Sequence, residues 1–251
     1  MVEASWLPID SFFGDTFVAY LDICGFKNMM REIENEKAVN TLNAFFRTVY
    51  EGATTSQEIC CIAVSDCAIA FVGKRQSEGP TIACMNSCST DNDLARLNSM
   101  LEFVRHVSES MIDQGVAISG SIAYGSLQFM KKYEGERTVK ALFLGQAYLE
   151  AYNDFENCRP KLRPGQIRIA KTIKMKELLN SSKGEGNDLS LVKSGPGGYY
   201  FYWMSDDIQA RSEIDHKISY FYKEKAFDAL ISVLKDYSSL SRKARQEREK
   251  I

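Results

Sequence analysis

The sequence predicts a single α+β domain with a ferredoxin-like core, in which an antiparallel or mixed sheet is flanked by helices. Over residues 16–125 the hydrophobic pattern runs strand, helix, strand, strand, helix, strand, which is the element order of that core. The 251 residues are 45% hydrophobic, enough to bury one large core. No internal repeat or low-complexity linker divides the chain, so we expect one domain over residues 1–251, with its core at about 14–205.

The first half of the chain supplies the clearest elements. Thr16 to Leu21 is apolar and β-rich, which predicts a buried strand ending at Asp22. Apolar residues then recur at three- and four-residue steps, which predicts a helix from about Lys27 to Tyr50. The β-rich runs 58–64 and 68–72 flank a short polar turn and predict a hairpin.

The remaining elements follow from the same patterns. Residues 74–92 are polar and are expected to form a long loop. Small residues in the run 115–124 indicate a strand that allows close backbone approach. The other expected elements are helices at 93–113, from Gly145 to about Phe155 and at 212–234, strands at 141–144, 167–170, 189–192 and 199–204, and a charged tail within 212–251.

Composition excludes several classes of protein. The 31 Lys and Arg nearly balance 33 Asp and Glu, so no basic stripe indicates nucleic acid as a substrate. No eighteen-residue apolar run and no signal peptide is present, so no membrane segment is expected. The seven cysteines lack the spacing of a zinc site, and only two histidines occur. We therefore expect a reduced, cytoplasmic protein whose metal ligands are mainly carboxylates.

Two aspartates stand out because each ends or joins predicted strands. Asp22 follows the first strand, and Asp66 lies in the hairpin turn. Each has a plain structural explanation: Asp22 as a helix cap and Asp66 as a turn residue. If the strands are neighbours, however, the two carboxylates meet, and like charges held close need a cation. Mg²⁺ accepts one or two protein carboxylates together with phosphate oxygens, and two such ions serve phosphoryl chemistry.

The residues after Asp22 suit a triphosphate. Cys24, Gly25 and Phe26 open a helix, whose free backbone N–H groups can bind phosphate, and Gly25 permits close approach. The chemistry predicted is nucleotidyl transfer, either to another molecule or within one.

These residues also carry a family resemblance. Asp22-Ile23-Cys24-Gly25-Phe26 resembles the Asp-Ile-x-Gly-Phe signature of class III nucleotide cyclases, and Ser65-Asp66 resembles their Gly-Asp hairpin. Ser121 to Gly125 resembles their Gly-Ile-x-x-Gly strand, with Ser121 replacing the first Gly. Phe143 to Tyr148 is similar to the strand-to-helix segment that follows.

The resemblance implies a mechanism and an assembly. Asp22 and Asp66 would be catalytic and would bind two Mg²⁺ or Mn²⁺ per site, with help from the Ile23 carbonyl. The ribose 3′-hydroxyl would attack the α-phosphate and expel pyrophosphate. The family forms head-to-tail dimers, so a homodimer with sites at its interface is implied.

Several positions depart from the family pattern. The purine-reading positions fall near Ile62 and Leu142, which are aliphatic and cannot hydrogen-bond a base. The transition-state Asn and Arg fall near Leu149 and Asn153, of which only Asn153 is polar. Lys193 stands near the pyrophosphate-contacting lysine, although it is also explained as a solvated strand end.

The residues that contact a purine base are absent, whereas both metal-binding aspartates are retained. This combination indicates a pyrimidine substrate. The chain resembles the uridylate and cytidylate cyclases of bacterial anti-phage (Pycsar) signalling, which retain both aspartates and narrow the base pocket with a bulky side chain. Tyr50 is the candidate for that side chain, and a core-packing role is its alternative. UTP is favoured slightly over CTP, and the resemblance implies a separate effector that responds to the cyclic nucleotide. A degenerate domain that binds nucleotide or a partner without turnover, or a purine cyclase, remains the alternative.

Overall fold

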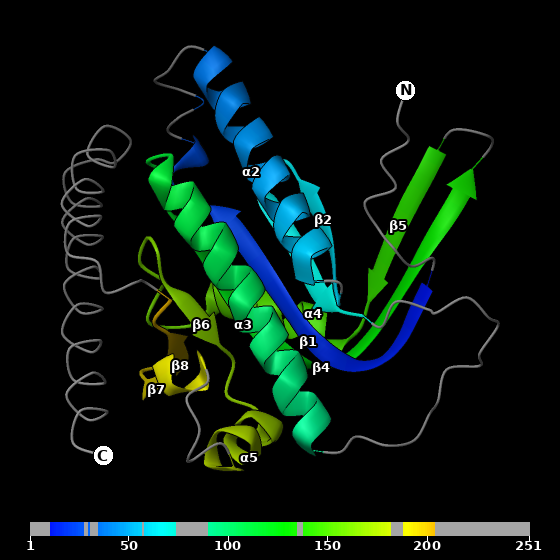
Figure 1. Ribbon diagram of the computed structural model, residues 1–251, viewed down its shortest axis with the longest axis vertical. Helices are drawn as coiled ribbons and strands as arrows, with labels where there is room; N and C mark the ends of the chain where they lie inside the picture. Colours follow the sequence, from blue (N-terminus) through cyan, green and yellow to red (C-terminus); the bar gives the residue numbers. More distant parts are fainter. Residues whose placement is uncertain are drawn as a thin grey trace.

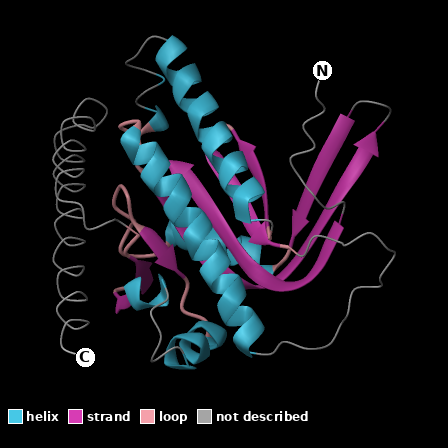
Figure 2. Cartoon of the chain, in the orientation of Figure 1, coloured by secondary structure: helices cyan, strands magenta, loops and turns pink. Residues whose placement is uncertain are grey.

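The computed structural model describes residues 11–27, 30, 35–56, 58–73, 90–134, 138–181 and 188–203. The expected helix and charged tail at 212–251 lie outside the described residues, as does the expected loop at 74–92 up to residue 89. The described part forms one mixed sheet with helices on both faces, as predicted (Figures 1 and 2).

The sheet has eight strands in the order β2-β3-β1-β4-β6-β8-β7, and β5 pairs with β4 off this path. Its first four strands have the β2-β3-β1-β4 arrangement of a ferredoxin-like core, and each adjacent pair among them is antiparallel. The strands are β1 (Ser11–Ile23), β2 (Ile59–Val64), β3 (Cys67–Val72), β4 (Ile118–Glu134), β5 (Thr138–Leu144), β6 (Ile167–Ile169), β7 (Val192–Gly195) and β8 (Gly198–Phe201).

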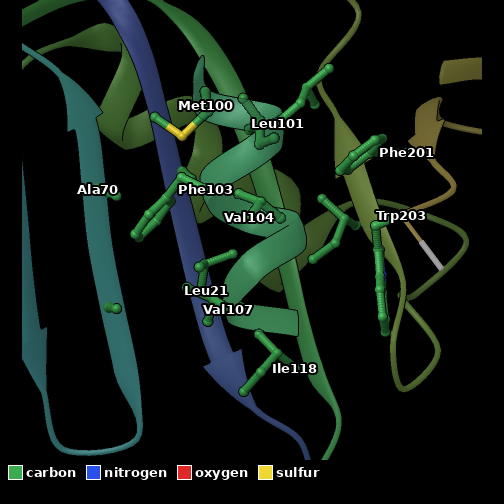
Figure 3. Packing of buried hydrophobic residues seen from close by; sticks show 14 of the residues in the cluster. Leu21, Ala70, Met100, Leu101, Phe103, Val104, Val107, Ile118, Phe201 and Trp203 are labelled. Atoms are coloured by element: carbon green, nitrogen blue, oxygen red, sulfur yellow. The ribbon is translucent and has the colours of Figure 1, made fainter. Parts of the chain in front are cut away.

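Helices α2 (Asn35–Ser56) and α3 (Thr90–Asp113) cover one face of the sheet, and α4 (Gln146–Asn157) covers the other. Strand β1 sends alternate side chains to the two faces, as the period of a strand requires. Leu21 joins the core under α2 and α3, where Phe103 and Val107 of α3 lie beside it (Figure 3). Tyr20 packs on the α4 face of the sheet. Asp22, two residues further along β1, is on the same face.

Four features differ from the sequence prediction. Helix α2 continues to Ser56, six residues past the expected end at Tyr50. Strand β4 continues ten residues past Tyr124 and forms with β5 a hairpin arm that projects beyond the helices (Figure 1). Helix α5 (Ile173–Ser181) was not predicted. The strand expected at 189–192 is wrong, because Asp188–Leu191 is a turn of 3₁₀ helix and the strand β7 begins at Val192.

Close approach at Gly120 explains the small residues in β4. A Cβ atom at Gly120 would lie 2.5 Å from Leu21 Cδ2 and 2.7 Å from the backbone oxygen of Tyr20. We expect Gly120→Ala to destabilise the protein by about 3 kcal/mol, because a backbone atom cannot move aside in a packed core. Urea denaturation would measure the loss.

Gly125→Ala is the matched control for Gly120→Ala, since its Cβ would meet no atom nearer than 3.3 Å. Equal losses of stability for the two variants would show that the contact with Tyr20 and Leu21 is not the cause.

None of the helices in the described part of the chain has the length and apolar character of a membrane-spanning segment.

Candidate functional site

The structure brings Asp22 and Asp66 together at one edge of the sheet. Strands β1 and β3 are antiparallel neighbours, and Asp22 lies opposite Cys67, the residue after Asp66. The amide of Ile23 donates to the carbonyl oxygen of Asp66 at 2.9 Å, which ties the end of β1 to the hairpin turn. The pairing of these strands therefore places the two aspartates side by side, as the spacing predicts.

The electrostatics of Asp22 reflect this closeness. Burial, followed by the negative charges of Asp66 and Glu156, raises the pKa of Asp22 to about 7, and only Lys27 opposes the shift. The carboxyl group is thus held where its charge is unfavourable in the protein alone. A cation between the two carboxylates would reverse that preference.

The hairpin turn holds Asp66 through an unusual backbone conformation at Ser65. Val64 and Cys67 pair across a two-residue turn, and Ser65 has a φ of 56°. Glycine favours this left-handed region, and the class III signature has glycine here. Ser65 therefore adopts a backbone conformation that glycine takes more readily.

The strain at Ser65 gives a stability prediction. We expect Ser65→Gly to stabilise the protein by about 1 kcal/mol, because glycine adopts a positive φ without a Cβ clash. Ser65→Ala keeps the Cβ atom and is expected to bring no gain. Urea denaturation of both variants would decide, and an equal change in both would show that φ is not the cause.

The segment expected to bind phosphate has fewer free amides than the sequence predicts. The amide of Ile23 bonds to Asp66, and the amide of Cys24 donates to the Ala117 carbonyl at 2.9 Å. Neither amide is free for a phosphate, which leaves those of Gly25 and Phe26 as the candidates. Gly25 has a φ of 77°, which turns the chain there, and Phe26 anchors the segment in the core.

Cys24 itself belongs to the structure of this segment. Its Sγ lies 3.0 Å from the Ser119 hydroxyl, which donates to the carbonyl of Arg163. Burial raises the pKa of the Cys24 thiol to about 11, so it is neutral at physiological pH. The side chain packs rather than reacts.

Two of the three expected base-pocket residues, Tyr50 and Ile62, lie at the outer strand β2 but on opposite faces of the sheet. The Tyr50 hydroxyl accepts a hydrogen bond from the amide of Ala63 at 3.3 Å, next to Ile62 on the outer strand β2. Tyr50 also packs against the core under α2 and α3, so both explanations of this residue describe part of its surroundings. Ile62 packs on the opposite, α4 face.

The third residue, Leu142, lies far from the aspartates of the same chain. Leu142 pairs with Met130, which pairs with Ser11 at the start of β1. Asp22 is eleven residues further along β1, roughly 35 Å of strand. One chain therefore does not join Leu142 to the aspartates.

Lys193 is likewise distant from the aspartates, whereas Asn153 lies on helix α4. Lys193 is exposed on β7, the last strand of the sheet, four strands from β1. Asn153 is exposed on α4, and its Oδ1 accepts a bond from Asn157 at 3.5 Å. Strand order therefore separates Lys193 from Asp22 within one chain.

Sequence reasoning missed the groups on α4 that approach Asp22. Glu156 lies close enough to raise the Asp22 pKa. Tyr152, one turn earlier, packs edge-on against Tyr20 with ring centroids 5.4 Å apart. The four-residue spacing of Tyr152 and Glu156 places both on one face of α4, which was the available signal.

Comparison with known proteins identifies the fold. No family model matches the sequence, and no curated protein does. The solved structure of the adenylyl cyclase CyaB from P. aeruginosa matches 76% of this chain and 95% of its own, with a TM-score of 0.51 and 16% identity. The chain has the fold of class III nucleotide cyclase catalytic domains.

Two further structures extend the likeness. A bacterial light-regulated adenylyl cyclase matches 85% of this chain and 59% of its own, at TM-score 0.52 and 8% identity. A class III adenylyl cyclase-like ATP-binding protein from Pseudomonas aeruginosa matches 73% and 38%, at TM-score 0.50 and 14% identity. At these identities the likeness to class III cyclases establishes the fold.

Proposed function

We propose that this protein is a nucleotide cyclase that converts a pyrimidine nucleoside triphosphate, UTP before CTP, to its 3′,5′-cyclic monophosphate and pyrophosphate. The observation that carries the proposal is the pair Asp22 and Asp66, held together at the end of β1 on a cyclase fold.

The residues present fit a pair of divalent cations. Oxygen donors come from the two carboxylates and from the Ile23 carbonyl, and Mg²⁺ takes one or two protein carboxylates with phosphate and water as its other ligands. Among the described residues, no group of three or more His, Cys, Asp and Glu side chains is arranged to hold a metal ion, and the proposal rests on the carboxylate pair alone. Bound Mg²⁺ or Mn²⁺ would lower the pKa of the attacking hydroxyl and neutralise charge on the phosphates.

The chain's own groups orient the nucleotide. The hydrogen bond from Ile23 to the hairpin turn fixes the separation of the two carboxylates, so little reorganisation accompanies substrate binding. The amides of Gly25 and Phe26 face the triphosphate at the start of a helix.

The base preference rests on aliphatic and aromatic side chains. Ile62 and Leu142 offer no hydrogen bond to a purine edge, and a site without such groups has no means to select ATP or GTP. Tyr50, which packs on the α2 and α3 face behind the outer strand β2, is the aromatic side chain proposed to narrow the pocket for a single-ring base.

A second copy of the chain would complete the site. Leu142 and Lys193 lie apart from the aspartates of their own chain, which supports a head-to-tail homodimer with sites at its interface. The cyclic product would act on a separate effector, as an anti-phage signal.

The competing function is nucleotide or partner binding without turnover. Leu149 is half-exposed and apolar on α4, and Asn153 bonds to its own helix, so α4 offers little to a transition state. A purine cyclase is the other alternative.

The deciding experiment incubates the protein with ATP, GTP, CTP and UTP separately, with Mg²⁺ or Mn²⁺, and resolves products by mass spectrometry. Cyclic UMP or CMP, absent with Asp66→Asn, would support the proposal. Cyclic AMP or GMP would overturn the base preference. Nucleotide binding without any product would favour the binding module.

A further inference from the structure

A buried arginine in the sheet contacts both helix α4 and the β7–β8 hairpin. Arg168 of β6 is 0% exposed. Its Nε donates to Asp154 Oδ2 of α4 at 2.7 Å, and its Nη1 donates to the Pro160 carbonyl at 2.7 Å. Its Nη2 donates to the backbone carbonyl of Asp154. The guanidinium therefore holds the end of α4 and the segment that follows.

Asp154 has a second donor in the strand beneath. The hydroxyl of Ser121, also 0% exposed, donates to the same Oδ2 atom at 2.6 Å. Ser121 pairs with Arg168 in the sheet. This is the position where the cyclase signature has glycine, so the hydroxyl that meets Asp154 is a feature of this chain.

The other side of Arg168 contacts the β7–β8 hairpin. Arg168 pairs with Tyr200 of β8, and the Tyr200 hydroxyl donates to the Pro196 carbonyl within the hairpin at 2.6 Å. A Cβ atom at Gly198 would lie 2.7 Å from Arg168 Cγ, so the arginine stem lies directly on the hairpin. Tyr200 in turn pairs with Lys193.

We infer that Asp154, Arg168 and Ser121 are positioning residues that hold α4 and the β7–β8 hairpin as one rigid unit. This inference rests on the proposed function, because the unit carries the two groups that a dimeric cyclase would offer across its interface. Asn153 precedes Asp154 on α4, and Lys193 is one strand from Tyr200. The ion pair thus sets the distance between a transition-state group and a phosphate-binding group.

Physical chemistry supports this role over simple stabilisation. A fully buried guanidinium needs its charge and its donors matched, and three of them converge here on α4 and its C-terminal segment. Removing the charge of Asp154 would leave Arg168 buried without its counter-charge, and both neighbouring elements would loosen. Misplacement of catalytic groups by about 1 Å is enough to cost roughly 100-fold in rate.

The test compares Asp154→Asn with a matched control, Asp93→Asn. Asp93 is 0% exposed and its Oδ2 lies 2.7 Å from Lys174 Nζ, so it is a buried ion pair of similar geometry in α3 and α5, away from the hairpin. Hydrogen exchange followed by mass spectrometry would be measured on the full chain. We expect Asp154→Asn to raise exchange in both 151–157 and 193–200, and Asp93→Asn in neither.

Steady-state kinetics distinguish a positioning role from a loss of stability. We expect Asp154→Asn to lower kcat with UTP by about 10- to 100-fold while KM changes less than about threefold. Asp93→Asn should lower Tm by a similar amount and keep kcat within about twofold. If Asp154→Asn does not fold, Ser121→Gly removes one donor without exposing a charge and takes its place.

The outcomes are distinguishable. Increased exchange confined to α4, with residues 193–200 unchanged, would overturn the inference. Equal kcat losses in Asp154→Asn and Asp93→Asn would also overturn it. If the wild type forms no cyclic nucleotide, the proposed function fails, while the exchange measurement still decides whether α4 and the hairpin move as one unit.

Discussion

Asp66→Asn is expected to lower the rate of cyclic nucleotide formation by about 1,000-fold, the largest effect of any substitution considered for this chain. The change keeps the size and shape of the side chain and removes a negative charge. The hairpin turn is held by backbone bonds, including that from Ile23 to the Asp66 carbonyl, and these remain. The loss would therefore come from cation binding and not from the fold.

The measurement is product formation from UTP at saturating Mn²⁺, with Tm recorded for each variant. Glu102→Gln, an exposed carboxylate on α3, is the control for removal of one charge and should leave the rate unchanged. A rate within tenfold of the wild type for Asp66→Asn would contradict the two-carboxylate mechanism. It would also remove the observation on which the proposed function rests.

The geometry around the aspartates follows from sequence because it is local. A hairpin brings its own ends together, and the ferredoxin-like order makes β1 the neighbour of β3. Once those strands pair, Asp22 and Asp66 must lie close together. Residues 16–21 of β1 are buried on both faces of the sheet, and a shift of one residue would bury Asp22 under α2 and α3.

The contacts of α4 and β6 could not be predicted in the same way. Arg168 sits in the apolar run 167–170, where its neighbours indicate a buried strand but nothing indicates its partner. Asp154 is 14 residues away, and Ser121 is 33 residues from Asp154. Only tertiary packing joins them. The length of β4 was missed for a related reason, because its continuation past Tyr124 is held by pairing with β1 and β5 and by tertiary burial of Leu127 and Phe129.

The second large effect concerns pH and metal binding at Asp22. In the folded protein without metal, the pKa of Asp22 is raised to about 7, whereas an unfolded chain has about 3.9. Between these values the folded state holds a proton that the unfolded state has released, so stability falls as pH rises from 4 to 7 and is level above. Because Asp22 is partly exposed, we expect this contribution to be about 1–2 kcal/mol.

Asp22→Asn isolates this contribution, because asparagine resembles the protonated acid. In EDTA-treated protein the variant should match the wild type near pH 4.5 and exceed its free energy of unfolding at pH 8 by about 1–2 kcal/mol. Urea denaturation at both pH values measures the difference. A variant less stable than the wild type at pH 8 would mean that the Asp22 charge is already compensated within the protein.

Divalent cations should reverse the order of stability. Mn²⁺ binds only the deprotonated carboxylate, so millimolar Mn²⁺ should raise the Tm of the wild type more at pH 8 than at pH 5.5. Asp22→Asn and Asp66→Asn should each lose this increase, whereas Glu102→Gln should keep it. An increase in Tm that persists in both aspartate variants would place the cation elsewhere. While the site is empty, the repulsion between Asp22 and Asp66 destabilises the protein, and a bound cation removes that repulsion. The same pair therefore governs stability, metal affinity and turnover.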